Sequence, residues 1–174
     1  SVKVSTTTEV YNEFSSGRQD ITAIRDYARY MYENGGSLKY LLLFGDCSFD
    51  YKDRLSNNTN FVPTYESRQS FHPIFSYSSD DYYGFFEEDE GEWIETSAGD
   101  HTLEIGVGRL PVSTTEEAQD VVDKIIYYST SSNTLGKWRN EITYVGDDGD
   151  GNVHARHVEE LSELIDTTYA QYDI

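Results

Sequence analysis

The sequence is poor in cysteine, in basic residues and in long apolar runs, and each shortage excludes a class of protein. The one cysteine, Cys47, has no second thiol to pair with, so the chain holds no internal disulfide. No apolar run approaches the ~20 residues that a membrane-spanning helix needs. Only 13 basic residues stand against 32 acidic ones, and the net charge of −19 argues against nucleic acid and anionic membrane surfaces as partners.

What the sequence has in quantity is negative charge and apolar residues. Its 174 residues, 37% of them hydrophobic, are enough to build a folded domain with a core. The surplus of carboxylates suits a protein that gathers hard cations, calcium above all, although solubility alone explains the same composition. The sequence opens at Ser1 without a methionine and ends where a new strand could begin. We therefore interpret it as a piece of a longer protein, whose targeting signals would lie elsewhere.

Three apolar runs that each end in a glycine organise the sequence. Tyr40–Phe44 runs into Gly45, and a short unbroken apolar run closed by a turn signal is typical of a buried strand in a parallel sheet. Leu103–Val107 and Ile142–Val145 repeat the pattern. If the three strands are parallel, the polar residues after them share the edge of the sheet at which α/β proteins bind ligands.

The remaining elements follow from local signals. Ser1–Val10 is polar and β-branched and predicts a strand, and Asp20 predicts the N-cap of a helix that runs to Glu33. The opening is therefore expected to be β-α-β. Asp80–Trp93 holds two aromatic segments around an acidic turn and predicts a β-hairpin.

Two further helices complete the predicted α/β fold. Ser113–Glu117 offers a capping box in either of two registers, ahead of a helix with a core-facing apolar stripe. The stripe consists of Ala118, Val121, Val122, Ile125 and Ile126. The last helix is expected from about Val153, after the third strand and an acidic loop.

Cys47 lies just beyond a strand end and is the first candidate nucleophile. His72, His101, His154 and His157 are the histidines that could serve as its base. A lone cysteine without a local catalytic signature is usually a small packed residue, and we interpret Cys47 in that way.

Two acidic patterns are candidate cation sites. Asp148–Asn152 has the alternating spacing of a calcium loop with Glu159 at the twelfth position, but Val153 stands where an EF-hand needs glycine. A nonstandard cation site, an acidic loop facing a neighbouring active site and a turn that caps the helix all remain open. Asp100 and Glu104 lie an even number of residues apart, so an extended chain places both on one face, where they could share a calcium ion or simply be solvated.

Phosphate chemistry has little support in the sequence. It contains neither a G-x-x-x-x-G-K nor a G-x-G-x-x-G segment. Asp46, Asp147 and Asp148 at predicted strand ends suggest a magnesium-dependent phosphatase or receiver-like domain, but the lysine that such sites need after a later strand is not evident.

Several segments, in order, resemble the gingipain-type cysteine peptidases of family C25, most of all the members that act as sortases of the type IX secretion system. The matching segments are Val10–Gly17, Leu41–Asp46, Phe61–Tyr65, Ser79–Gly84, Ile105–Val112 and Trp138–Asp148. The resemblance implies a three-layer, caspase-like α/β fold of two subdomains. Residues 1–130 would form the first, 129–136 a linker, and 137–174 the opening strand and helix of the second.

The resemblance also implies where the chemistry lies. The family's catalytic histidine and cysteine belong to segments of the second subdomain that would follow Ile174, and Cys47 does not match the nucleophile. No catalytic residue is therefore expected here, apart from an acid that orients the histidine, for which Asp147, Asp148 or Asp150 are candidates. The family binds structural calcium near the counterpart of Asp100 and Glu104.

The function implied is that of an endopeptidase on the extracellular or outer-membrane surface of a bacterium. It would remove C-terminal sorting domains from secreted cargo, with protein or peptide substrates and other secretion-system components as partners. The piece itself is expected to be inactive. A non-catalytic, calcium-stabilised surface module is the alternative from another class, and a magnesium-dependent phosphatase or receiver-like domain is a second.

Overall fold

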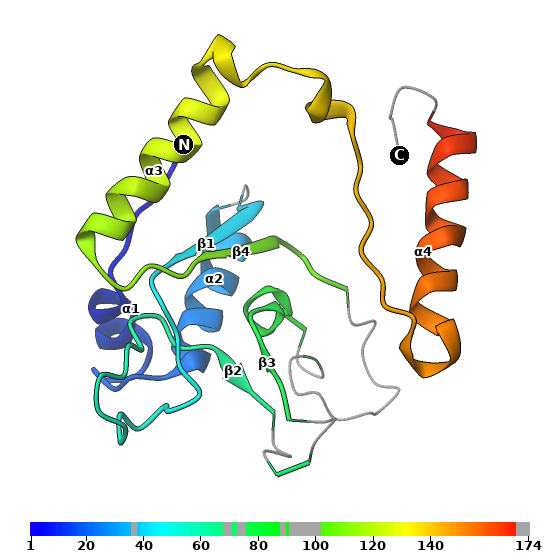
Figure 1. The fold of residues 1–174 in the computed structure, drawn as a ribbon. Coiled ribbons are helices and arrows are strands. Elements are labelled where there is room, and N and C mark those ends of the chain that lie inside the picture. The colour runs from blue at the N-terminus through cyan, green and yellow to red at the C-terminus, as the bar shows by residue number, and fades with distance from the viewer. Residues whose placement is uncertain (36–37, 68–70, 73–75, 88–89, 91–101, 170–174) are drawn as a thin grey trace. The chain divides into compact units, whose positions relative to one another are not determined.

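A computed structural model describes the chain apart from residues 36–37, 68–70, 73–75, 88–89, 91–101 and 170–174 (Figure 1). The chain divides into an N-terminal unit, Ser1–Val121, and a C-terminal unit, Val122–Ile174. The first holds helices and a parallel strand pair, which confirms the predicted α/β class. None of the described helices is long and apolar enough to cross a membrane. The proposed assignment of residue ranges to two subdomains stays a prediction.

The N-terminal unit opens with two helices, α1 (Thr7–Phe14) and α2 (Ile21–Gly35). The predicted strand over Ser1–Val10 is wrong, because Thr6 and Glu9 form a capping box: Glu9 N–H donates to Thr6 Oγ1 at 3.2 Å, and Thr6 N–H donates to Glu9 Oε2 at 2.8 Å. The start predicted for α2 is confirmed, since the Asp20 carboxylate accepts a 2.8 Å hydrogen bond from Thr22 N–H.

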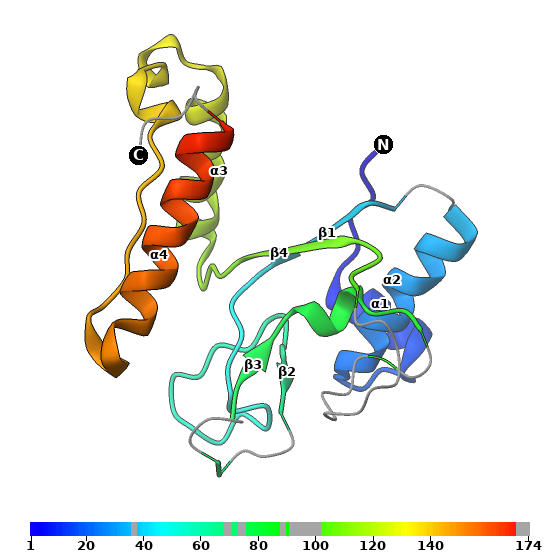
Figure 2. The same ribbon diagram turned by 90° about the vertical axis from the view of Figure 1, so that its right-hand side faces the viewer.

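The parallel pair consists of β1 (Tyr40–Phe44) and β4 (Gly106–Leu110), which lie side by side in Figures 1 and 2. The ladder aligns Tyr40 with Gly106 and Phe44 with Leu110. The strand predicted at Leu103–Val107 is thus shifted by three residues. Glu104 N–H donates to Gly84 O at 3.1 Å, so this part of the chain bonds outside the ladder and β4 begins only after it. The shift places Arg109 inside the strand.

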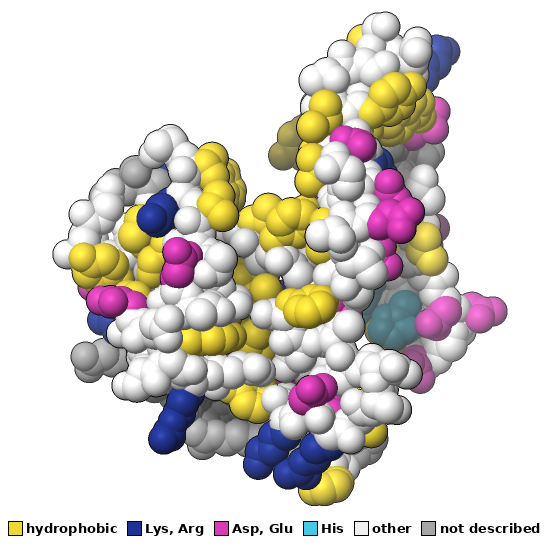
Figure 3. All heavy atoms as spheres, turned by 90° about the vertical axis from the view of Figure 1, so that its left-hand side faces the viewer, with side chains coloured by type: hydrophobic (Ala, Val, Ile, Leu, Met, Phe, Trp, Pro, Cys, Tyr) yellow, Lys and Arg dark blue, Asp and Glu magenta, His cyan; other side chains and the backbone are white. Residues whose placement is uncertain are grey.

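The core of the unit lies between α2, the inward face of β1 and a set of tyrosines. Leu43 is 3% exposed, and Tyr83 is fully buried. The core cluster around them includes Val10, Ala23, Ile24, Val62, Tyr65 and Tyr82. The other face of β1 is exposed, with Tyr40 at 79% and Leu42 at 58%, so the strand is buried on one face only among the described residues. Apolar side chains are visible on the surface in Figure 3.

The segment between β1 and β4 forms a small second sheet and one helical turn. β2 (Tyr65–Glu66) and β3 (Ser78–Ser79) pair in antiparallel fashion, and the 3₁₀ turn η1 (Asp81–Gly84) follows. The hairpin predicted from Asp80 is therefore wrong over residues 81–84, and most of its second half lies outside the described residues. The helical turn prevails because it buries Tyr82 and Tyr83. The Tyr83 hydroxyl donates a hydrogen bond to the carbonyl of Pro63.

Helix α3 (Thr115–Thr130) crosses the division between the units. Its start confirms a capping signal: Glu117 N–H donates to Thr114 Oγ1 at 3.1 Å, and Ser113 N–H donates to Glu117 Oε2 at 2.7 Å. The apolar stripe of this helix was predicted to face the core, but no residue of α3 is buried within the described part of the chain, and Ile126 is 53% exposed.

The C-terminal unit continues with the short turns η2 (Ser132–Thr134) and η3 (Lys137–Asn140) and with α4 (Gly149–Thr168). Arg139 holds the turns to the end of α3, since its guanidinium donates to the carbonyls of Tyr128 and Thr134 at 2.6 and 2.9 Å. Ile142–Val145 forms no strand in the structure. A strand needs a hydrogen-bonded neighbour, and no sheet forms among the described residues of this unit.

Candidate functional site

The candidate site is the carboxyl edge of the β1–β4 pair. The two strands stay bonded beyond their ends, with Gly45 N–H donating to Leu110 O and Asp46 N–H donating to Val112 O, each at 3.0 Å. A loop returns onto this edge, where the N–H groups of Phe61 and Val62 donate to Asp46 O at 3.0 and 3.1 Å. Parallel sheets bind ligands at this edge, so its side chains are candidates for ligand binding.

Asp46 is clamped by hydroxyl groups from two other parts of the chain. Its Oδ2 accepts hydrogen bonds from Thr59 Oγ1 and, at 3.0 Å, from Ser113 Oγ. The Thr59 hydrogen bond is the main cause that lowers the pKa of Asp46, and the Ser113 and Cys47 hydrogen bonds and the positive charge of Arg109 act in the same direction against partial burial. Asp46 is therefore a fixed, ionised carboxylate.

Arg109 is the second charged residue of the edge, and its side chain is only 10% exposed. Nε and Nη2 donate to the two carboxylate oxygens of Asp80, each at 2.7 Å, in a bidentate pair. Nη1 donates to Gly45 O at 2.8 Å and to Val62 O at 2.7 Å, and Nη2 reaches Pro63 O at 3.4 Å. All five N–H donors of the guanidinium are thus used, and they join three segments of the chain.

Cys47 is partly buried next to these two charged residues. Burial is the largest influence and raises the pKa of its thiol, the charge of Arg109 lowers it, and the charges of Asp80, Asp46 and Glu66 raise it further. The net direction is upward, so the thiol is neutral near pH 7. An activated nucleophile has the opposite shift.

Of the two predicted calcium ligands, only Glu104 can be placed, because Asp100 lies outside the described residues, as does His101. Glu104 Oε2 accepts a 2.9 Å hydrogen bond from Phe86 N–H. Glu104 also borders an open hollow of about 830 Å³ at the amino end of the sheet, together with Tyr32, Lys39 and Tyr40. This hollow is at the opposite end from the candidate edge. Hard carboxylate oxygens suit calcium, but the described residues include no cluster of three or more metal-ligating side chains.

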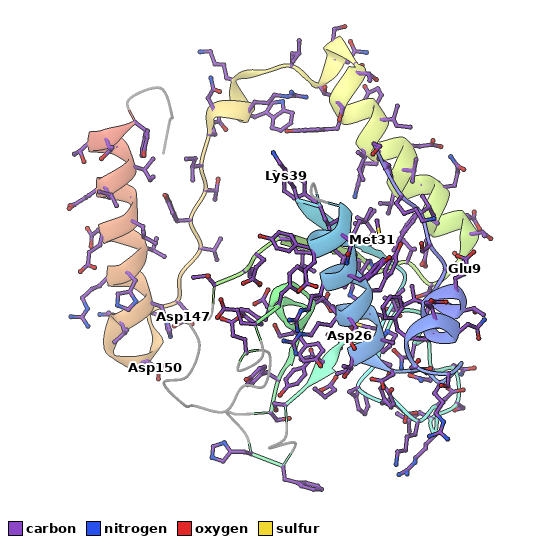
Figure 4. All side chains as sticks on the ribbon, turned by 180° about the vertical axis from the view of Figure 1, so that it is seen from behind. Glu9, Asp26, Met31, Lys39, Asp147 and Asp150 are labelled. Atoms are coloured by element: carbon purple, nitrogen blue, oxygen red, sulfur yellow. The ribbon has the colours of Figure 1, made fainter. Side chains whose placement is uncertain are left out.

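The acidic loop of the C-terminal unit forms the beginning of α4 (Figure 4). Asp147 Oδ1 accepts a 2.8 Å hydrogen bond from Gly149 N–H, and Asp148 occupies the N-cap position without a side-chain cap bond. Asp150, Gly151 and Asn152 all have positive φ. The acidic loop thus forms the turn expected before a helix. Glu159, at the twelfth position of the calcium-loop pattern, is exposed on α4.

Sequence reasoning missed the pairing of Arg109 with Asp80 and the two hydroxyls on Asp46. One signal was available: Arg109 is the only charged residue in the otherwise apolar and glycine-containing run Ile105–Pro111. An arginine inside a half-buried strand needs acceptors, which predicts an acidic partner and carbonyl groups nearby. The pattern does not say which acid serves, because Asp80 is 29 residues away in the sequence.

The family model of peptidase family C25 matches residues 1–174, the whole of the chain. Neither a curated protein nor a solved structure gives a significant match.

Proposed function

The chain belongs to peptidase family C25, and from this premise we propose that it supplies the first α/β subdomain, and the beginning of the second, to a cysteine endopeptidase. The match of the family model along the full chain carries the proposal. The parallel β1–β4 pair agrees with it, since a caspase-like peptidase is built on a mainly parallel sheet. Membership in a peptidase family implies proteins or peptides as substrates.

The catalytic cysteine and histidine of this peptidase lie outside the 174 residues. The neutral thiol of Cys47 supports this part of the proposal, because a thiol whose pKa is raised is a poor nucleophile. In the longer protein, a thiolate formed by proton transfer to the histidine would attack the peptide carbonyl carbon. The carbon–nitrogen bond breaks, the amine leaves with a proton from the histidine, and a thioester acyl-enzyme remains.

The finer proposal is that the longer protein is closest to PorU, the type IX secretion sortase. It would act on the extracellular or outer-membrane surface of a bacterium and cleave C-terminal sorting domains from secreted cargo, in contact with other secretion components. The support is the order of matching segments, from Val10–Gly17 to Trp138–Asp148.

Asp100 and Glu104 are proposed to hold a structural calcium ion, and Asp147 or Asp148 to orient the catalytic histidine. Carboxylate chemistry supports the first. For the second, the support is that the Asp147 side chain is held in one orientation by its bond with Gly149 N–H.

One experiment tests the proposed activity. The 174-residue chain and a version extended through the family's Gly-His-Gly segment and downstream cysteine are incubated with fluorogenic peptides and with a thiol-reactive probe. We expect cleavage only by the extended version, loss of cleavage when its downstream cysteine is changed to alanine, and normal cleavage in Cys47→Ala.

Two results would contradict the proposal. Cleavage by the 174-residue chain that disappears in Cys47→Ala would make Cys47 the nucleophile. An extended sequence without the histidine and cysteine, and without activity, would favour the non-catalytic calcium-stabilised module.

A further inference from the structure

The Arg109 guanidinium is the point at which the separate segments of the carboxyl edge are joined. Its acceptors are the carbonyls of Gly45, Val62 and Pro63 and the carboxylate of Asp80. They lie 29 to 64 residues from Arg109 in the sequence, so no local turn or helix can hold them in place.

The loop that Arg109 holds packs tightly over the end of β1. A Cβ added at Gly45 would lie 3.0 Å from Val62 Cγ2 and 3.1 Å from Phe61 Cβ, and Gly45 has a φ of +150°. The loop around Phe61 and Val62 has no regular secondary structure of its own. Its conformation therefore depends on tertiary contacts: the Asp46 carbonyl and the Arg109 guanidinium hold its backbone, together with the Tyr83 hydroxyl on the Pro63 carbonyl and the burial of Val62 in the core.

The hydrophobic core of the unit does not depend on this guanidinium in the same way. Leu43, Ile24, Ala23 and Tyr83 pack with one another through apolar surface between α2 and β1. The bonds of Arg109 all go to the edge, where parallel sheets bind ligands. Removing this five-donor fork of hydrogen bonds would take the Arg109 donors from the carbonyls of Gly45 and Val62 and from the Asp80 carboxylate, while the core keeps its contacts.

We infer that Arg109 is a positioning residue for peptide binding: its fork on Asp80 and on the carbonyls of Gly45 and Val62 presets the substrate-binding edge before the peptide arrives. This inference rests on the proposed peptidase function and assigns substrate binding to the carboxyl edge of β1 and β4. Preset loops lower the cost of ordering when a ligand binds, so loss of the fork should weaken peptide binding more than it slows the chemical step.

The first test uses the chain itself and needs no activity. Arg109→Lys keeps the charge but cannot form the five-donor fork. In hydrogen exchange we expect the amides of Phe61 and Val62, which donate to Asp46 O, to exchange about tenfold faster, while the amides of α2 keep their protection. Arg29→Lys is the matched control, since Arg29 forms an exposed ion pair with Glu33 at 2.8 Å on the surface of α2.

The second test uses the extended, active protein and separates KM from kcat. For Arg109→Lys and for Asp80→Asn we expect KM for a peptide to rise about tenfold, with kcat per titrated active site within about twofold of wild type. Arg29→Lys should leave both constants unchanged.

Three outcomes would overturn the inference: unchanged exchange at Phe61 and Val62, a fall in kcat with KM unchanged, or equal loss of α2 protection, which would make Arg109 a general stabilising residue. If the extended wild type cleaves no peptide, the proposed function fails on its own, and the exchange result still decides whether Arg109 presets the edge.

Discussion

The two units of the chain differ in what their apolar residues contact. Every buried hydrophobic residue among the described positions lies in the N-terminal unit, from Val10 to Ile105, whereas the described part of the C-terminal unit buries only Thr134. Leu161 and Leu164 on α4 remain 50% and 57% exposed, although their spacing is that of a core-facing helix. An amphipathic pattern thus predicts which face will be buried, but burial requires a partner surface.

The largest expected difference between the units concerns core truncation. Leu43→Ala removes a side chain that is 3% exposed and should destabilise the N-terminal unit by about 2–5 kcal/mol, because it leaves a cavity between α2 and β1. Leu161→Ala in α4 is the matched control and should change the free energy of unfolding by at most about 0.5 kcal/mol. Urea unfolding measures both, and equal effects would show that α4 is packed as tightly as β1.

Calcium should stabilise the N-terminal unit, which contains Asp100 and Glu104, through a site that does not involve Asp148 of the C-terminal unit. If Asp100 and Glu104 hold a structural ion, thermal unfolding with calcium rather than EDTA should show stabilisation of about 2.7 kcal/mol when free calcium is a hundredfold above its Kd. The shift should vanish in Asp100→Ala/Glu104→Ala and persist in Asp148→Ala. Absence of any shift in the wild type would remove the calcium proposal.

The helix caps offer a smaller contrast. Thr6→Ala removes the hydroxyl that accepts from Glu9 N–H in the capping box at the start of α1, and should lower the free energy of unfolding by about 1 kcal/mol. Asp148 caps α4 without a side-chain hydrogen bond, so Asp148→Ala should change stability by only a few tenths of a kcal/mol. Chemical denaturation followed by circular dichroism compares the two variants, and a costlier loss at Asp148 would contradict the arrangement at the start of α4.

The smallest expected effect is the pH dependence from Asp46. Its pKa is lower in the folded chain than its ordinary value of 3.8, chiefly through the Thr59 hydrogen bond. The stability that the ionised Asp46 carboxylate contributes to the folded chain is therefore fully present above about pH 4 and is lost as the pH falls through the pKa of the folded state. Asp46→Asn should flatten the decline of stability below pH 4 by roughly 0.5 kcal/mol, a small value because the carboxylate is partly exposed. Thr59→Val should flatten it too, because it removes the hydroxyl that donates to Asp46 Oδ2.

Several elements were predictable because their signals lie within a few residues. Asp20 marks the start of α2, Gly45 the end of β1, and Thr114 with Glu117 the start of α3. The capping box at Thr6 and Glu9 is an equally local signal, and the strand predicted there is wrong because the hydrogen bonds of the cap outweigh the strand preference of the β-branched residues.

The sequence by itself therefore determined the α/β class, the family and the sites at which α2 and α3 begin. The tertiary structure decided which face of β1 is buried, where β4 enters the ladder and which acid pairs with Arg109. The physical reason is range: caps and turns are made between neighbours in the sequence, whereas the acceptors of Arg109 lie up to 64 residues away and meet only when the chain is folded.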